Sequence, residues 1–472
     1  MESFNKVIEK IDNLVWGIPL ILLILGCGIF LTIRAGGIQF RKLGLALKYM
    51  FKDEKSGTGE ISSFAALCTA LSATIGTGNI VGVATAIAAG GPGALFWMEI
   101  AALFGMATKY AEGLLAVKYR VRSTDGKMLG GPFYYIENGM GIRWKWLAAM
   151  FAVFGVFVGL MGIGTFTQVN SITAAANSFF DPDKSHTFTL FGNSYTYTQA
   201  IVGLIITVLA GLIIIGGIKR IASVSEIVIP IMVVVYVLCC LIIICTHITE
   251  VPEAFAKIIK SAFGLRAAAG GALGAIIVSV QKGIARGIFS NEAGLGSAPI
   301  AAAAAKTKEP VRQGLVTMTG TFIDTILVCT MTGLTIVISG CLEKNPGLEG
   351  VEITNAAFRY GLPFPEKISS FLLMSCLMFF AFTTILGWNY YSERCLSYLT
   401  GSNRVVSTVF KWLYIAAVFI GPYLTVSAVW NIADIFNGLM ALPNVAALIA
   451  LSGVVSAETK KYCDKMKSSK RS

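Results

Sequence analysis

Long runs of apolar residues alternate with short polar and basic stretches along the whole chain. Eleven of these runs reach the length of about 20 residues that an α-helix needs to cross a bilayer. The predicted spans are residues 15–33, 62–90, 93–117, 147–178, 198–217, 221–246, 268–290, 313–339, 368–391, 405–425 and 427–456. We therefore predict an all-α polytopic membrane protein with 11 transmembrane helices.

Positive charge is distributed unevenly between the two sides that these spans define. Of the 38 Lys and Arg residues, 27 fall in the odd-numbered connections and the C-terminal tail, when Arg286 and Lys411 are counted at span edges. Because basic loops mark the cytoplasmic side, we expect the N-terminus outside and the C-terminus in the cytoplasm. The net charge of +12 is then an orientation signal, and it makes anionic lipid a partner of the cytoplasmic face.

The number of spans also predicts how the chain is organised. One helix followed by ten is the arrangement expected of an extra helix and two groups of five with opposite orientations. On this interpretation residues 1–60 form the extra transmembrane helix and a basic cytoplasmic loop, and residues 458–472 form a basic cytoplasmic tail. Residues 61–247 and 248–457 form the first and second inverted repeats. No sequence similarity between the halves is visible, so the repeat rests on the count.

Composition excludes several classes of catalyst. The chain is 55% hydrophobic and 14% charged, and its ten cysteines form no C-x-x-C pair. No zinc-binding H-E-x-x-H motif, phosphate-binding G-x-x-x-x-G-K-[ST] loop or G-x-S-x-G nucleophile elbow occurs. We therefore expect neither an enzyme nor an ATP-driven pump, and no organic cofactor.

The second predicted span places Gly76, Gly78 and Gly82 among polar side chains, including Thr77 and Asn79. Glycine costs about 1 kcal/mol relative to alanine in a helix interior, so this helix is predicted to break. A break at mid-membrane frees amides that can hold a carboxylate and carbonyls that can hold a cation. Close helix packing through the Gly78-x-x-x-Gly82 pattern remains an alternative explanation.

The same stretch reads TIGTG from Thr74 to Gly78, which is similar to the carbonyl-lined filter of potassium channels. It lies inside a full-length span and has no separate short pore helix before it. An ion channel is the alternative from a different functional class.

Six motifs in order resemble those of the alanine or glycine:cation symporter family. They are GTGNIVGVATAI at 76–87, GGPFYYIENG at 130–139, QVNSI at 168–172, RGIFSNEAGLGSAP at 286–299, TFIDT at 321–325 and NIADIFNGLMALPN at 431–444. The resemblance implies a prokaryotic plasma-membrane (inner-membrane) protein of the LeuT-type fold. It also implies secondary active co-transport of alanine or glycine with sodium by alternating access, with a proton-coupled carrier as the alternative.

In that fold the first and sixth core helices, here the second and seventh spans, are broken around the substrate. The resemblance assigns ten residues to the substrate: Thr74, Gly76, Thr77, Gly78, Asn79, Gln168, Gly270, Gly274, Ile277 and Trp388. The amides of residues 76–78 are expected to face the substrate carboxylate, and the amide of Gln168 to bond the amino acid. A purely interhelical hydrogen bond of Gln168 is the alternative, and Trp388 is a gate, a pocket wall or an interfacial anchor.

The seventh span is expected to break at Gly270, Gly271 and Gly274, with close packing as the alternative. Ile277 is then an apolar neighbour of the substrate side chain. Such a wall favours an alanine-sized substrate over larger ones. Each additional methylene group on the substrate changes the discrimination by only about 1–3 kcal/mol, so we expect selectivity to fall gradually with substrate size.

For the cation, adjacent Thr383 and Thr384 resemble the paired hydroxyls of a sodium site known in this fold. The expected sodium ligands are Ser72, Ile75, Phe380, Thr383 and Thr384, with the carbonyls of the first three residues completing the site. Oxygen ligands of this kind suit a hard cation. The alternative is that the threonines bond back to their own helix.

Asp324 lies near the middle of the eighth predicted span, where a charge is a functional candidate by default. Three roles remain open for it: a structural pair with a basic residue, a second cation site and a proton relay. We therefore treat Asp324 as a possible coupling residue.

Overall fold

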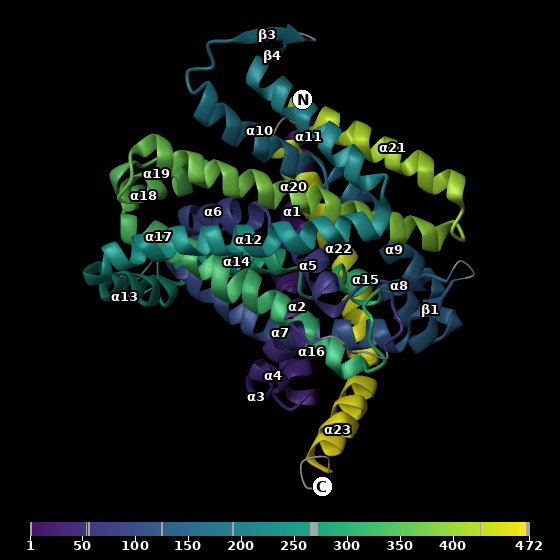
Figure 1. Ribbon diagram of the computed structural model, residues 1–472. Helices are drawn as coiled ribbons and strands as arrows, with labels where there is room; N and C mark the ends of the chain where they lie inside the picture. The colour runs from purple at the N-terminus through teal and green to yellow at the C-terminus, as the bar shows by residue number, and fades with distance from the viewer. Residues whose placement is uncertain are drawn as a thin grey trace.

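The computed structural model describes residues 2–52, 54, 57–123, 126–190, 193–264, 272–424 and 426–468, and these are mostly helical (Figure 1). The helices up to residue 246 are α1 (Glu2–Val15), α2 (Ile18–Arg34), α3 (Ile38–Arg41), α4 (Leu43–Met50), α5 (Ser63–Thr74), α6 (Val83–Gly90), α7 (Gly93–Lys118), α8 (Pro132–Tyr135), α9 (Lys145–Met161), α10 (Phe166–Phe180), α11 (Tyr197–Ile214) and α12 (Gly217–Thr246).

The later helices are α13 (Val251–Ala262), α14 (Ala272–Asn291), α15 (Ala298–Ala302), α16 (Pro310–Thr321), α17 (Thr330–Ser339), α18 (Cys341–Lys344), α19 (Val351–Gly361), α20 (Glu366–Leu399), α21 (Arg404–Ile420), α22 (Val426–Ala450) and α23 (Ser452–Ser468). Wider π-helical turns form η1 (Gly78–Gly82), η2 (Ile136–Met140) and η5 (Phe322–Cys329), and tighter 3₁₀ turns form η3 (Ile142–Trp144), η4 (Ile248–Glu250) and η6 (Gly421–Tyr423).

Two short antiparallel hairpins interrupt the helical pattern, which the all-α prediction did not include. Strands β1 (Val121–Arg122) and β2 (Met128–Leu129) follow α7, and β3 (Thr187–Leu190) and β4 (Asn193–Thr196) follow α10. Each hairpin occupies a connection between predicted spans. They therefore add local structure to the loops without changing the helical class.

Within the described residues, eight helical segments are long and apolar enough to cross a membrane, and the bent pair Ser63–Thr74 and Gly78–Gly90 makes a ninth. The coarse prediction of a polytopic helical membrane protein is confirmed. The count of 11 spans stays a prediction, because α2 has only 17 residues and the 20 residues of α14 include Lys282 and Arg286.

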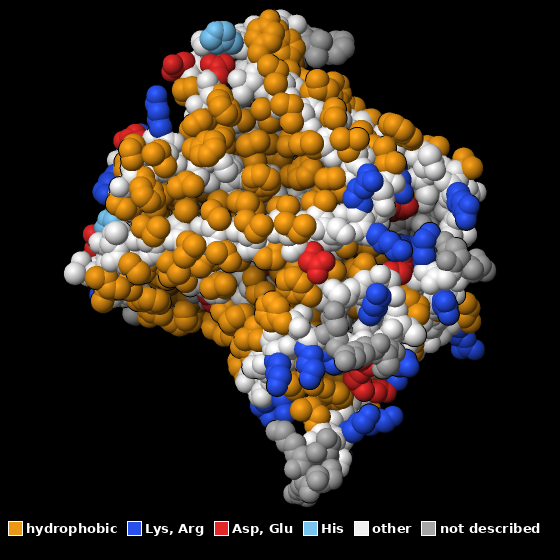
Figure 2. Space-filling model, viewed as in Figure 1, with side chains coloured by type: hydrophobic (Ala, Val, Ile, Leu, Met, Phe, Trp, Pro, Cys, Tyr) orange, Lys and Arg blue, Asp and Glu red, His pale blue; other side chains and the backbone are white. Residues whose placement is uncertain are grey.

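The surface divides into an apolar band and a basic end. Figure 2 shows hydrophobic side chains across the middle of the molecule, where α11 and α12 expose residues such as Leu204, Leu212 and Ile227. Lys and Arg side chains gather below this band, toward the projecting helix α23. We call this the basic end, and the opposite end, which carries β3 and β4, the hairpin end.

Helix α7 lies in the interior and organises its neighbours. It packs against α16, α14 and α2, so that most of its length is buried. Two charged residues of α7, Lys109 and Glu112, are consequently buried as well. Buried polar groups need partners, and Glu112 finds them at the Gly294 amide and the Asn444 side chain.

Candidate functional site

The second span is interrupted at the predicted place. Helix α5 ends at Thr74, and the segment that resumes at Gly78 is inclined to it by 53°. Ile75 has an extended backbone, with φ −75° and ψ 99°. The Ile75 amide still donates to the Leu71 carbonyl at 2.7 Å, but this conformation turns the Ile75 carbonyl and the amides of Gly76 and Thr77 toward other groups.

Side chains take up the amides that the break releases. The Gly76 amide donates to Asn79 Oδ1 at 3.0 Å, and the Thr77 amide donates to Gln168 Oε1 at 3.4 Å. The Thr77 hydroxyl is buried and finds no hydrogen-bond partner among the described residues. The interhelical hydrogen bond foreseen as an alternative for Gln168 is therefore present.

Gln168 reaches the break because its own span is also interrupted. Helix α9 ends at Met161, α10 begins at Phe166, and Gln168 lies in the first turn of α10. The Tyr414 hydroxyl donates to the Gly164 carbonyl at 2.7 Å within this interruption. The irregular backbone thus gains a partner from α21.

The five residues expected to hold sodium lie together where α5 meets α20. Thr384 Oγ1 is 3.3 Å from the Ile75 carbonyl oxygen and 3.1 Å from that of Phe380. Thr383 Oγ1 donates to the same Phe380 carbonyl at 2.9 Å. Both threonines thus bond back to their own helix, as the alternative supposed, and Thr384 also contacts the break.

Ser72 completes this group from the last turn of α5. Its hydroxyl is buried, donates to the Thr69 carbonyl at 2.8 Å, and lies 2.8 Å from the position that a Cβ on Gly387 would occupy. The absence of a side chain at Gly387 therefore lets α5 and α20 approach closely. The cluster contains hydroxyl and carbonyl oxygens, which fit a hard cation.

The seventh predicted span breaks elsewhere than expected. Helix α14 continues to Asn291, and the chain leaves the helix between Glu292 and Ser297 before the short helix α15. Positive φ angles at Glu292 (54°), Gly294 (91°) and Gly296 (81°) define the interruption. Two of its residues are glycines because this left-handed region excludes most side chains.

The predicted breaking point at Gly270, Gly271 and Gly274 is therefore wrong in its described part. Gly270 and Gly271 lie outside the described residues, whereas Gly274 is helical, with open space where a Cβ would be. Ile277 is 52% exposed. Glycine content alone misled the prediction for Gly274, since the described part of this span, from Ala272 to Asn291, is a continuous helix that ends before the turn at Glu292–Ser297.

Buried carboxylates fix the second break from two sides. Glu112 Oε1 accepts from the Gly294 amide at 3.1 Å and from Asn444 Nδ2 at 2.8 Å, and Asn444 Nδ2 also donates to the Gly294 carbonyl at 2.8 Å. On the other side, Glu292 accepts from Trp388 Nε1 at 3.0 Å and from the Ser297 hydroxyl. The structure thus places Trp388 against the second break.

Asp324 connects the two interrupted spans. Its Oδ1 accepts from Asn79 Nδ2 at 2.8 Å, and its Oδ2 accepts from the hydroxyls of Ser290 at 2.9 Å and Thr325 at 2.7 Å. Asp324 forms no ion pair within 4.0 Å in the described part of the chain, so its partners there are neutral donors. Gly78 adds a direct contact, since its Cβ position lies 3.2 Å from Ser290 Cα.

The model described as the sodium:alanine symporter family matches residues 1–472. The chain belongs to the sodium:alanine symporter family. An uncharacterized transporter of Haemophilus influenzae is 54% identical over 98% of this chain and 97% of its own. The sodium/alanine symporter AgcS of Methanococcus maripaludis is 44% identical over 98% and 97%, and the probable sodium/glutamine symporter GlnT of Bacillus subtilis is 37% identical over 99% and 93%.

A solved structure supports the fold. MhsT in complex with L-phenylalanine superposes with a TM-score of 0.55 and 13% identity, covering 85% of this chain and 98% of MhsT. At this identity the likeness concerns the fold alone. It confirms the LeuT-type architecture that the resemblance implied for this member of the symporter family.

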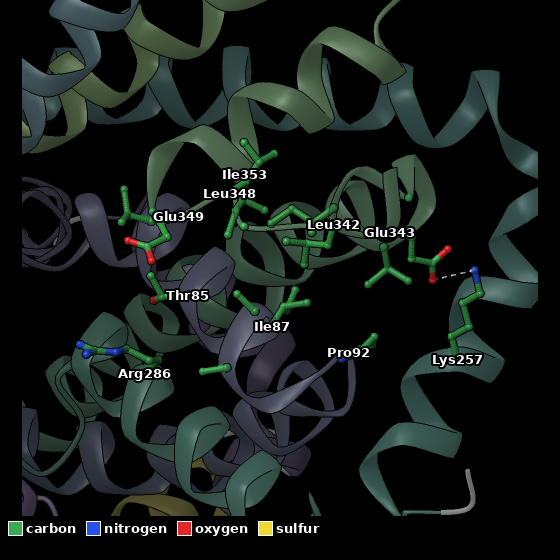
Figure 3. A pocket seen from close by; sticks show the side chains of 18 residues that line it. Thr85, Ile87, Pro92, Lys257, Arg286, Leu342, Glu343, Leu348, Glu349 and Ile353 are labelled. Atoms are coloured by element: carbon green, nitrogen blue, oxygen red, sulfur yellow. Dashed lines mark hydrogen bonds and ion pairs between the residues drawn. The ribbon is translucent and has the colours of Figure 1, made fainter. Parts of the chain in front are cut away.

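A cavity of about 970 Å³ lies beside the first break, on the side of α6 (Figure 3). Thr85 and Ile87 of α6 line it, with residues of α17–α19 on the far wall. Arg286 also lines it and forms an ion pair with Asp434 at 3.3 Å.

Sequence reasoning gave no role at the second break to three residues that hold it: Glu112, Tyr135 and Asn444. The Tyr135 hydroxyl donates to Asn444 Oδ1, which orients the amide toward Glu112. Two signals were available. Tyr135 and Asn444 lie inside motifs of the symporter family, and Glu112 is a charge within an apolar span.

Proposed function

We propose that the protein is a sodium-coupled symporter for alanine or another small neutral amino acid and that it works by alternating access. One observation carries the proposal. The peptide segment from Ile75 to Thr77 presents its first carbonyl to the Thr384 hydroxyl and its next two amides to Asn79 and Gln168. A cation bound to the Ile75 carbonyl and a substrate carboxylate bound to the Gly76 and Thr77 amides would contact the same three-residue segment. Binding of either one would therefore order this segment for the other.

The amides already face oxygen atoms, which supports a carboxylate site at this break. Asn79 Oδ1 and Gln168 Oε1 are acceptors of the kind that a substrate carboxylate provides, and the longer of the two contacts, at 3.4 Å, involves Gln168. We assign substrate contacts to Thr74, Gly76, Thr77, Gly78, Asn79 and Gln168. Trp388 forms a wall, and the exposed Ile277 and Gly274 are left out of the pocket.

Sodium is proposed to bind Ser72, Ile75, Phe380, Thr383 and Thr384. Rotation of the two threonine hydroxyls would turn their lone pairs from the helix carbonyls toward the ion. A tenfold sodium gradient and about 100 mV together supply about 3.7 kcal/mol per ion, enough for roughly 400-fold accumulation of a neutral solute. One sodium ion per amino acid is therefore sufficient for uphill uptake.

The finer architecture is part of the same proposal. We propose 11 crossings, with α2 as the extra helix and two inverted groups of five within residues 61–247 and 248–457. The basic end is assigned to the cytoplasm, where it contacts anionic lipid, and the N-terminus to the outside of a prokaryotic plasma membrane. The gathering of Lys and Arg at one end supports this orientation (Figure 2).

Proton coupling is the second candidate, because Asp324 joins the two broken spans through Asn79 and Ser290. A change in its protonation would alter a link between both spans at once. A second cation at the same carboxylate is the other role compatible with this position.

Uptake of labelled alanine into proteoliposomes tests the function. We expect accumulation that needs an inward sodium gradient and saturates with alanine, and a panel containing glycine, serine, glutamine and D-alanine defines the substrate. Equal uptake with and without the sodium gradient would contradict sodium coupling. Uptake driven by a pH gradient and abolished by Asp324→Asn would favour the proton-coupled carrier, and non-saturating conductance would favour a channel.

A further inference from the structure

Arg120 follows α7 at the basic end, and its side chain donates to four backbone carbonyls. Nη1 donates to Ala303 at 2.7 Å and to Ala305 at 2.8 Å. Nη2 donates to Thr58 at 2.7 Å and to Thr307 at 2.5 Å. Thr58 precedes α5, and the other three residues follow the start of α15. One guanidinium therefore joins the chain before the first break to the chain after the second.

The two segments also pair directly through their backbones. The Glu60 amide donates to the Ala304 carbonyl at 2.8 Å, and the Lys306 amide donates to the Ile61 carbonyl at 2.8 Å. Ile61 and Ala305 form a parallel bridge. We call this contact, with the Arg120 hydrogen bonds, the basic-end junction.

Two glycines make the junction too close for side chains. A Cβ on Gly57 would lie 2.4 Å from the Lys306 carbonyl oxygen, and a Cβ on Gly59 would lie 2.4 Å from the Ala305 carbonyl carbon. Real Cβ atoms do not approach backbone atoms so closely. The two segments therefore pack backbone against backbone, with no room for a side chain at Gly57 or Gly59.

The other side of the first break is open by comparison. Helix α5 starts at the junction, and α6 leads away from it to the 970 Å³ cavity. The cavity reaches the η1 turn at Val81 and the Arg286–Asp434 pair. The molecule is thus closed at the basic end and hollow on the opposite side of the site.

We infer that Arg120 is a positioning residue for transport, acting as a latch that holds the basic end closed while the cavity side is open. The inference rests on the proposed alternating access. Arg120 contacts neither the proposed substrate residues nor the proposed sodium ligands, and it acts by tying the outer ends of α5 and α15. Opening the basic end replaces its four carbonyl partners with water, and closing restores them.

The planar guanidinium suits this role because its fork of donors engages several carbonyls at once. A lysine at the same position keeps the positive charge but offers one flexible ammonium. The latch therefore predicts that Arg120→Lys retains part of the closure and that Arg120→Ala loses it. A residue needed only for folding would not show this graded, local effect.

Hydrogen–deuterium exchange of the purified full chain tests the latch. In Arg120→Ala we expect amides of residues 57–61 and 303–307 to exchange at least about tenfold faster, the scale of one lost charged hydrogen bond. Arg120→Lys is expected to fall between Arg120→Ala and wild type. The matched control is Arg122→Ala, which removes an equal charge from an exposed residue of β1 and is expected to leave exchange unchanged.

A second variant keeps the test decisive if Arg120→Ala fails to fold. Gly59→Ala forces the junction apart while Arg120 stays intact, and it is expected to speed exchange in the same two segments. Its control is Gly44→Ala, where a Cβ meets open space. Wild-type exchange in both segments of Arg120→Ala or Gly59→Ala, or faster exchange throughout the chain, would overturn the latch. Because exchange needs no transport, a failure of sodium-driven uptake would overturn the proposed function and leave this result standing.

Discussion

The two interrupted spans are broken in different ways. At the first break Ile75 is extended, no residue of the turn has a positive φ, and the freed amides meet the neutral side chains of Asn79 and Gln168. At the second break Glu292, Gly294 and Gly296 are left-handed, and buried carboxylates hold the turn. The first break has exchangeable partners, whereas the second is held by buried carboxyl side chains with several donors.

This difference separates the proposed ligand site at the first break from the hydrogen-bonded support at the second. A ligand can replace an amide side chain at the first break at little cost, because neutral hydrogen bonds in proteins contribute only about 0.5–1.5 kcal/mol each. A buried carboxylate with several donors is far harder to displace. We therefore expect substitutions at the first break to lower ligand affinity and substitutions at the second break to lower the stability of the folded protein.

The largest effect is expected from Glu112→Ala. The substitution leaves the Gly294 amide without its acceptor in the protein interior and removes one of the two acceptors of Asn444 Nδ2. We expect a loss of about 2–4 kcal/mol of stability, seen as a lower melting temperature of the purified protein in detergent.

Glu458→Ala is the control for Glu112→Ala, because Glu458 pairs with Lys118 where both side chains are partly exposed. Such a surface pair is worth about 0–1 kcal/mol. Equal melting temperatures for Glu112→Ala and Glu458→Ala would contradict the expectation that the second break contributes mainly to stability.

An intermediate effect is expected from Thr384→Ala at the first break. The substitution removes the only hydroxyl that joins the Ile75 and Phe380 carbonyls in the described residues. We expect the sodium concentration for half-maximal uptake to rise about tenfold or more, the scale of one ligand interaction of about 1.4 kcal/mol. The melting temperature without sodium should change little.

Thr384→Ser sharpens that measurement, since it keeps the hydroxyl and removes a methyl group. It is expected to restore most of the sodium affinity. A Thr384→Ala protein with wild-type sodium dependence would place the cation elsewhere.

The smallest effect is expected from Ile277→Ala. Ile277 is 52% exposed on α14, well before the second break at Glu292. The half-saturating alanine concentration should stay within about twofold of wild type, as for surface substitutions generally. A larger change would return Ile277 to the substrate pocket and move the functional part of this span toward its start.

Local patterns predicted the first break well. Gly76, Gly78 and neighbouring polar residues stand out in an apolar run, and a helix cannot easily absorb them. The Thr383, Thr384 and Phe380 cluster was equally accessible, because residues three and four apart share a helix face. In both cases the decisive contacts are close in sequence or follow from helix geometry.

The second break escaped prediction because its cause is distant in sequence. Glu112 and Asn444 are separated by 332 positions, yet both contact Gly294. A left-handed Glu292 also gives no signal in composition, and the glycines near residue 270 attracted the prediction instead. Tertiary contacts, which a single sequence does not display, decide where this span turns.

The cavity above the first break has a further consequence for how a solute arrives. At about 30 Å³ per molecule, its 970 Å³ hold roughly 30 waters, so a solute enters still hydrated. One alanine in that volume has an effective concentration of about 2 M, far above ordinary levels in solution. A solute inside the cavity is therefore confined beside Val81 and Thr85, next to the first break, at a local concentration far above that of dilute surroundings.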